Sequence, residues 1–159
     1  MAWAKNGTPD TLTSTGDTMT ISDLTEKKFG LILCHVISSG TTNSQMTFNN
    51  DTTNEYANRQ SDDGAADGTQ TSTTGLTDNG SPAADFFSVN YLCDISSEEK
   101  LIYQFQINPT ATGASTIPSR REQVSKHVPT ENQITEIDMT NAGAGDYAAD
   151  SNLSALGTD

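Results

Sequence analysis

Apolar and polar side chains alternate along two neighbouring segments, DFFSVNYLCD at 85–94 and KLIYQFQINP at 100–109. A period of two is typical of half-buried β-strands. The polar sequence ISSEEK between them favours a short reversal, so the two segments are predicted to form an antiparallel hairpin. We expect the hairpin to contribute to the core through one face, which comprises Phe87, Val89, Tyr91, Cys93, Leu101, Tyr103, Phe105 and Ile107.

Several other segments also have strand-like patterns. KFGLILCHVIS is apolar on both faces, which favours a central strand covered from both sides and leaves a buried helix as the alternative. Met19 and Ile21 alternate with polar residues in DTMTISDL, and a shorter strand is expected around Met46 and Phe48. With REQVSKHV, QITEIDMTN and DYAADSNLSALG, the chain has about eight predicted strands, most of them bounded by turn residues.

This pattern predicts an all-β fold, an antiparallel β-sandwich for which a jelly roll of about eight strands is the leading topology. An immunoglobulin-like sandwich is the second choice, because Trp3 precedes both cysteines. Residues 1–159 suit a single domain, with 1–16 as an extended N-terminal arm. The polar stretch 58–84 is expected to be a surface excursion or an edge strand with flanking loops, and 59–73 its exposed loop.

The charge of the chain restricts its partners. With 21 acidic and 8 basic residues, the formal net charge is -13. This argues against a nucleic-acid-binding surface, because affinity for phosphate depends on Lys and Arg. No apolar run approaches the roughly 18 residues of a membrane span, and MAWAKNGTPD lacks the regions of a signal peptide. We therefore expect a soluble protein made in the cytosol, with no membrane insertion.

The chain offers few residues for catalysis. His35 lies in an apolar run and is interpreted as a hydrogen-bonded core residue, whereas His127 lies in a polar strand and is interpreted as solvated. The sequence contains no nucleophile elbow, phosphate-binding loop or zinc-like spacing. We predict no catalytic residues, no cofactor and no enzymatic activity. A hydrolase that uses the two histidines is the weakest alternative.

An aspartate-rich segment, DDGAADG, raises the question of calcium. Asp62, Asp63 and Asp67 supply the hard oxygen ligands that calcium prefers, but their spacing does not match a calcium-binding EF-hand loop. We predict solvated surface carboxylates and no metal site. Cys34 and Cys93 lie in apolar segments, where buried free thiols are the ordinary interpretation and a disulfide between them is the alternative.

Carbohydrate binding would require exposed aromatic side chains beside polar groups. If the aromatic residues of the hairpin belong to the core, Trp3, Tyr56 and Tyr147 are the obvious remaining candidates. A lectin-like function is therefore an alternative hypothesis.

Three stretches together resemble a known class of protein. TFNNDTTNEYANRQSDDG resembles the F-N-x-D-(T/S)-x-x-x-Y pattern of small β-sandwich virion proteins of tailed phages and related viruses. SRREQVSKHV followed by QITEIDMTNAGAGDYAADSNLSALG resembles the end of those proteins, and the hairpin fits between the two. The resemblance covers residues 17–157.

The resemblance implies roles for individual residues. Phe48 and Tyr56 would flank a loop and anchor it to the core, while Asn50 and Asp51 would form its turn. A tight reversal at Gly143 and Gly145 would precede the inward packing of Tyr147. Asp150 stands where members of the family often have Gly, and Asp can also adopt a left-handed turn conformation.

The implied function is that of a non-enzymatic structural protein on the virion surface, a capsid decoration or cement protein. The alternative is a carbohydrate-binding or host-adhesion module of a tail or fibre. The expected partners are capsid or tail proteins of the same particle, further copies of the chain in a homo-oligomer and, in the alternative, a host-surface glycan. Contact with the particle would use an edge strand or an exposed apolar patch.

Overall fold

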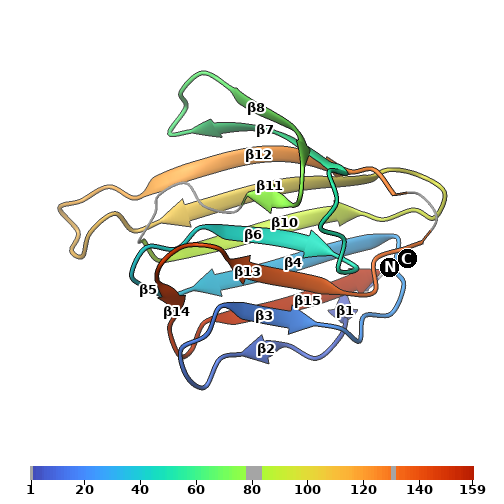
Figure 1. Cartoon of the computed structure of the whole chain (residues 1–159), viewed down its shortest axis with the longest axis horizontal. Helices are drawn as coiled ribbons and strands as arrows, with labels where there is room; N and C mark the ends of the chain where they lie inside the picture. Colours follow the sequence, from blue (N-terminus) through green and yellow to red (C-terminus); the bar gives the residue numbers. More distant parts are fainter. Residues whose placement is uncertain (1, 78–83, 130–131) are drawn as a thin grey trace.

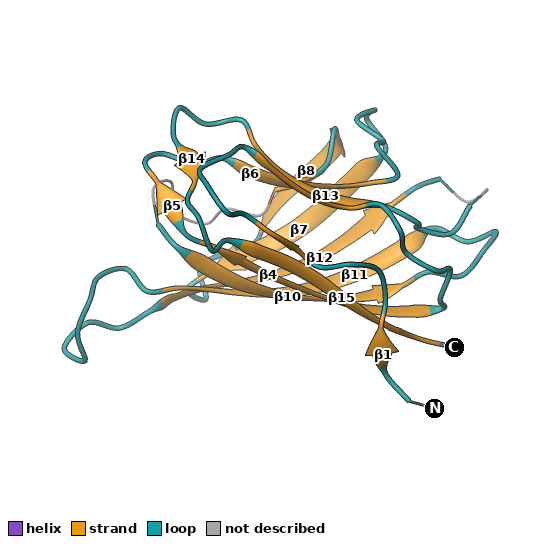
Figure 2. Ribbon diagram, turned by 90° about the horizontal axis from the view of Figure 1, so that it is seen from below, coloured by secondary structure: helices purple, strands orange, loops and turns teal. Residues whose placement is uncertain are grey.

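A computed structural model describes residues 2–77, 84–129 and 132–159. These residues form two main antiparallel sheets that pack face to face (Figures 1 and 2). The predicted all-β sandwich is therefore confirmed. The described residues contain no helix, and so none that is long and apolar enough to span a membrane.

The large sheet has the strand order β1–β15–β4–β10–β11–β12–β7–β8, with β2 also paired to β15. The predicted hairpin is present, because β10 and β11 pair in an antiparallel register that joins Phe87 to Ile107 and Cys93 to Leu101. The nine strands are β1 (Ala4–Lys5), β2 (Asp10–Thr11), β4 (Phe29–Val36), β7 (Tyr56–Asp62), β8 (Gly68–Thr73), β10 (Phe86–Cys93), β11 (Lys100–Asn108), β12 (Ser119–His127) and β15 (Asn152–Thr158).

The small sheet has the order β3–β13–β6–β9, and a two-stranded ribbon of β5 and β14 lies beside it. These strands are β3 (Thr18–Ile21), β5 (Ser38–Ser39), β6 (Ser44–Phe48), β9 (Leu76–Thr77), β13 (Ile137–Asn141) and β14 (Asp146–Tyr147). A jelly-roll topology is not confirmed. The centre of the large sheet is a simple meander of β10, β11 and β12, and the two sheets contain nine and four strands.

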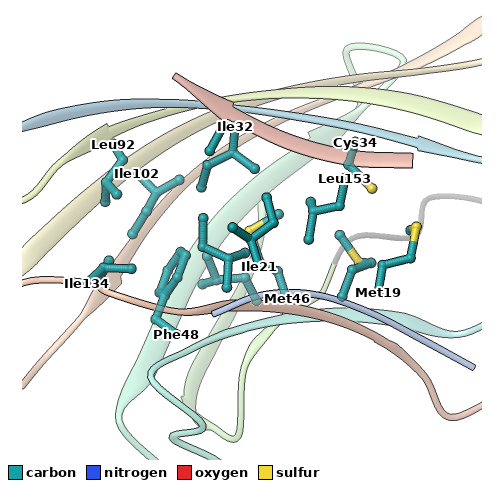
Figure 3. Close-up of a cluster of buried hydrophobic side chains, with 14 of the residues drawn as sticks. Met19, Ile21, Ile32, Cys34, Met46, Phe48, Leu92, Ile102, Ile134 and Leu153 are labelled. Carbon is teal, nitrogen blue, oxygen red and sulfur yellow. The ribbon is translucent and has the colours of Figure 1, made fainter. Parts of the chain in front are cut away.

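The apolar core lies between the two sheets (Figure 3). Met19 and Ile21 of β3, and Met46 and Phe48 of β6, point from the small sheet toward the large one and are fully buried, as their spacing predicted. The large sheet meets them with Ile32, Cys34, Leu92, Ile102 and Leu153.

The polar stretch after Tyr56 forms a β-hairpin at one edge of the large sheet. β7 pairs with β12 on one side and with β8 on the other, and β8 is the edge strand. Figure 1 shows this hairpin extending beyond the small sheet. The expectation of an edge strand is confirmed, whereas a loop over 59–73 is wrong because most of these residues belong to β7 and β8. Residues 78–83 of the stretch lie outside the described residues.

The turn between Phe48 and Tyr56 is anchored as the sequence predicted. Asn49 and Asn50 adopt positive φ angles of 54° and 56°, and the Asp51 N–H donates to the Phe48 carbonyl at 2.9 Å. The buried Tyr56 hydroxyl accepts from the Phe48 N–H and donates to the Asp51 carbonyl, each at 3.0 Å. One phenol therefore holds both ends of this turn.

The reversal before Tyr147 is confirmed, but the glycines serve close packing more than special dihedral angles. Tyr147 is fully buried. A methyl group on Gly145 would lie only 2.6 Å from the Gly40 carbonyl carbon and 2.7 Å from the Thr41 amide nitrogen. Asp150 has a φ of 70°, so it does adopt the left-handed conformation that its position in the turn requires.

Replacing Gly145 by Ala should destabilise the fold by about 1–3 kcal/mol, because the added methyl group meets backbone atoms that cannot rotate away. The matched control is Gly16→Ala, whose methyl group would approach only the Leu12 side chain, at 3.9 Å. Chemical denaturation of both variants measures the difference. Equal midpoints for the two variants would show that the backbones at 40–41 and 145 do not pack this closely.

Candidate binding surface

The two faces of the β10–β11 hairpin are reversed relative to the sequence prediction. Ser88, Asn90 and Gln106 point inward and are buried, whereas Tyr91 and Tyr103 point outward with 52% and 46% of their surface exposed. The alternation itself was correctly identified. A period of two cannot say which of its two faces meets the other sheet. Here it is the face that has most of the polar side chains together with Phe86, Leu92 and Ile102.

The outward side of the four central strands forms a continuous surface, which we call the outer face. Each of β4, β10, β11 and β12 contributes four outward positions, sixteen in all, and twelve of these side chains are apolar. Among the described residues, no element lies across the outer face in Figure 2. Its members are Phe29, Leu31, Leu33, His35, Phe87, Val89, Tyr91, Cys93, Leu101, Tyr103, Phe105, Ile107, Arg120, Glu122, Val124 and Lys126.

A hollow of about 510 Å³ lies on the outer face. Trp3 borders it and is 47% exposed; the rings of Phe29, Tyr91 and Tyr103 line it. The two tyrosines are cross-strand partners whose ring centroids lie 6.5 Å apart. Val124, half exposed, lines this hollow and two neighbouring ones toward β7 and β8. The outer face is therefore an uneven surface with aromatic groups at its centre.

The outer face is nearly free of acidic groups although the chain has 21 of them. Glu122 is its one carboxylate, and Arg120 and Lys126 are its cations. All three are on β12, so the outward positions of β4, β10 and β11 contain no Asp, Glu, Lys or Arg. A sheet face in permanent contact with water is normally polar, so this composition makes the outer face a candidate binding surface.

The inner face of the same strands contains a row of amide side chains. The strand registers place Asn90, Gln104, Gln123 and Gln60 side by side across β10, β11, β12 and β7. Among the described residues, the Gln60 and Gln123 amide oxygens have no hydrogen-bond partner. Buried amides of this kind are usually satisfied by ordered water. The interior is thus apolar beneath the small sheet and polar toward β7.

His127 is buried, with 2% of its surface exposed, so the prediction that it is solvated is wrong. Its ring stacks on Tyr56 at a centroid distance of 4.4 Å, and its Nε2 lies 2.8 Å from the Asp51 carboxylate. Burial lowers the pKa of His127, although the Asp51 carboxylate opposes this effect. Burial acts to raise the pKa of Asp51, but hydrogen bonds from Thr53 and His127 together lower it. A neutral imidazole that donates from Nε2 to Asp51 fits both shifts.

His35 is exposed, so the prediction of a core histidine is also wrong. It occupies an outward position of β4, opposite Phe87 of β10 and Asn152 of β15. The two histidines therefore lie on opposite faces of the large sheet, and nothing in the described residues brings them together as a catalytic pair.

The three aspartates of DDGAADG each contact an arginine or its backbone instead of a common point. Asp62 accepts from the buried Arg121 side chain at 2.7 Å, Asp63 accepts from the Arg120 N–H at 2.8 Å, and Asp67 pairs with Arg59 at 3.1 Å. No group of three or more potential metal ligands occurs among the described residues. Asp62 and Asp63 therefore fix the β7–β8 hairpin to β12, whereas Asp67 joins the turn of the hairpin to β7.

The structure also gives the burial of the two cysteines and of the three aromatic residues predicted as candidates for carbohydrate binding. Cys34 is buried and Cys93 is half-buried on the outer face, and the two are not joined by a disulfide. Tyr56 and Tyr147 are fully buried, which leaves Trp3 as the one exposed side chain of the three proposed for carbohydrate contact.

The sequence contained one signal that could have identified the outer face. Residues 86–93 and 101–119 contain no Asp, Glu, Lys or Arg. In a chain this acidic, a strand with one face in solvent should have charged residues on that face. Neutral amides alternating with aromatic side chains are instead compatible with two covered faces, one inside the fold and one in an assembly.

Comparison with known proteins does not assign a family. No family model matches the sequence, and no curated protein matches it. Among solved structures, the CBM2 module of the evolved Dit of Lactobacillus casei BL23 phage J-1 is 8% identical, with 89% of this chain and 69% of that chain covered. The TM-score is 0.21, and at that value the likeness carries no argument about fold or function.

The buried His127 predicts a pH dependence of stability. Because its pKa is lowered in the folded state, protonation favours the unfolded chain. Its contribution is complete above the ordinary histidine pKa of about 6.5 and is lost as the pH falls below that value toward the lowered one. Relative to a His127→Gln variant, the wild type should lose up to about 1.4 kcal/mol for each pH unit in this window.

Chemical denaturation between about pH 7.5 and about pH 5 provides the measurement. His35→Gln is the matched control, since His35 is exposed, and it should keep the wild-type pH dependence. A wild-type slope equal to that of His127→Gln would mean that His127 titrates as in the unfolded chain.

Proposed function

We propose that this chain is a non-enzymatic structural protein displayed on the surface of a virus particle, as a capsid decoration or cement protein made in the host cytoplasm. One observation carries the proposal: twelve of the sixteen side chains of the outer face are apolar, and several are half exposed. Apolar surfaces of this kind on a folded chain mark sites of association with other proteins.

The remaining surface supports the same role. With a net charge of -13 and an outer face that holds a single carboxylate, most of the acidic groups lie elsewhere. The negative surface disfavours unspecific contacts, whereas the outer face favours a specific contact through shape and burial. The resemblance of residues 17–157 to small virion proteins suggests that the assembly is a virus particle. Capsid or tail proteins and further copies of the chain are the proposed partners.

The proposed absence of enzymatic activity is supported by the placement of the two histidines. His127 is held between Tyr56 and Asp51, and within the described part of the chain its ring hydrogen-bonds only to the Asp51 carboxylate. Nucleophilic catalysis would need an activated hydroxyl or thiol within hydrogen-bond distance of such a base. The thiol of Cys93 is on the outer face instead, on the opposite side of the large sheet.

The proposal predicts that the chain co-purifies with intact particles. In gradient-purified particles from an infected host, quantitative mass spectrometry should find the chain at a ratio to the major capsid protein well above that of a minor contaminant. A non-structural protein of the same virus serves as the carry-over control. Recovery of the chain only in the soluble fraction would refute the proposal.

A carbohydrate-binding or host-adhesion module is the second candidate, and the aromatic cluster of Trp3, Phe29, Tyr91 and Tyr103 favours it. Stacked and exposed rings can bind the apolar faces of sugars. However, sugar hydroxyls also need convergent hydrogen-bonding groups, and the hollow offers few beyond the tyrosine hydroxyls, since the Ser125 hydroxyl accepts from Gln123 on the inner face. A protein partner therefore fits this surface better.

A glycan array, probed with and without calcium, separates the two candidates. We expect no glycan to bind above background in either condition. Specific binding that is abolished by Trp3→Ala and retained by Ile117→Ala would favour the adhesion module, because Ile117 is exposed but lies in the loop between β11 and β12.

A further inference from the structure

The centre of the outer face is a row of directly opposed apolar side chains. The strand registers align Leu31 of β4, Tyr91 of β10, Tyr103 of β11 and Val124 of β12. The row crosses four strands without a charged or amide side chain, and its last three members are about half exposed. Arg59 of β7 continues the row and ends its apolar part.

We propose that the outer face is the interface between two copies of this chain, which pack sheet against sheet around a two-fold axis near Tyr91 and Tyr103. The inference deepens the proposed structural function and rests on it in one respect, since a displayed subunit is present in many copies. In such a dimer each copy uses the same surface, so the aromatic row of one sheet meets that of the other.

The distribution of charge favours contact between two copies through the outer face over contact through other parts of their surface. Two chains that each have a net charge of -13 repel one another over most of their surface. The outer face is an exception, because it combines one carboxylate with two cations, all on β12. Glu122 lies 3.5 Å from Arg120, and Lys126 pairs with Glu99 at 2.9 Å. These charges form a polar rim beside an apolar centre, which is the usual composition of a protein interface.

The area of the outer face is also large enough for a stable protein–protein interface. Fully exposed aromatic side chains present roughly 150–250 Å² and aliphatic ones less, so each group that is 37–55% exposed would lose on the order of 100 Å² on contact. Eight such groups lie on the outer face or border its hollow, giving on the order of 800 Å² per copy, which matches the area buried by each partner in a standard interface. They are Trp3, Phe29, Phe87, Tyr91, Leu101, Tyr103, Ile107 and Val124.

The packing of two sheets supplies the geometry. Sheets that pack face to face lie about 10 Å apart, with the side chains of both filling the space between them. The hollow beside Trp3 gives each copy a depression next to the half-exposed Leu101 and Tyr103. A projecting group from one copy can therefore enter the depression of the other, and a two-fold axis repeats the contact.

The first experiment measures mass and tryptophan accessibility together. Multi-angle light scattering of the full chain from about 1 µM to about 1 mM should show a change from monomer to dimer. Trp3 is the single tryptophan of the chain and borders the hollow, so acrylamide quenching of its fluorescence should decrease over the same concentration range. A chain that stays monomeric throughout this range would overturn the proposal.

Variants then test the surface itself. Tyr103→Glu places a charge at the centre of the outer face and should raise the dissociation constant on the order of 100-fold. The control is Ile117→Glu, which alters a side chain that is 84% exposed in a loop and should dimerise as the wild type does. Circular dichroism checks that both variants fold, and Val124→Lys replaces Tyr103→Glu if that variant does not.

The outcomes separate this proposal from the proposed function. A dimer that survives Tyr103→Glu and Val124→Lys, or that leaves Trp3 equally accessible to acrylamide, would place the contact elsewhere and refute the inference. A monomer that nevertheless co-purifies with particles would refute the dimer and support the structural function, with a capsid or tail protein covering the outer face. A dimer that is absent from particles would support the dimer and refute the structural function.

Discussion

The alternation of side chains along each strand is the constraint on which this structure depends. Successive residues of a strand point to opposite faces, so the register that places one set of side chains inside also places the other set outside. In β10 and β11 the inward face combines small and amide side chains with Phe86, Leu92 and Ile102, and the other aromatic and aliphatic side chains point outward. The small sheet has four strands and the large sheet nine, so part of the inner face is not opposed by the apolar side chains of the small sheet.

The interior reflects this difference in size between the two sheets. Beneath the small sheet the packing is apolar. Toward β7 the buried side chains become polar and include amides, Arg121 and Lys100, the first residue of β11. Lys100 has no exposed surface, and its ammonium group lies 3.4 Å from Asp94 and donates to the carbonyls of Ile95 and Glu98. The Asp94 carboxylate also accepts from the Ile134 N–H, while burial raises its pKa. A buried ion pair of this kind adds little net stability, because the cost of desolvating the two charges offsets their attraction.

Sequence reasoning identified the strands that have a clear apolar periodicity, but it assigned most of the polar β7 and β8 to a loop. It also identified the inward faces of β3 and β6 and the turn held by Tyr56, where apolar periodicity and turn chemistry agree. It assigned the wrong environment to His35 and His127, and the wrong face to the β10–β11 hairpin. The reason is the same each time: burial was inferred from the immediate neighbours in the chain, whereas it depends on strand pairing. His127 is opposite Tyr56 and Lys100 in the sheet, and neither pairing is visible in REQVSKHV.

The pairing of the first strand with the last has a mechanical consequence. Both ends of the chain lie at the same end of the sandwich, and the antiparallel register places Ala4 beside Gly157 and Lys5 beside Leu156 (Figure 1). A force that pulls the two ends apart would act across these two strands, so their hydrogen bonds would break one after another and not all at once. Short terminal strands are also the parts of a fold that open at the lowest free energy. Tension would therefore detach β1 before it reached the core. Trp3 would move away with β1, so the hollow would lose the aromatic ring at its border first.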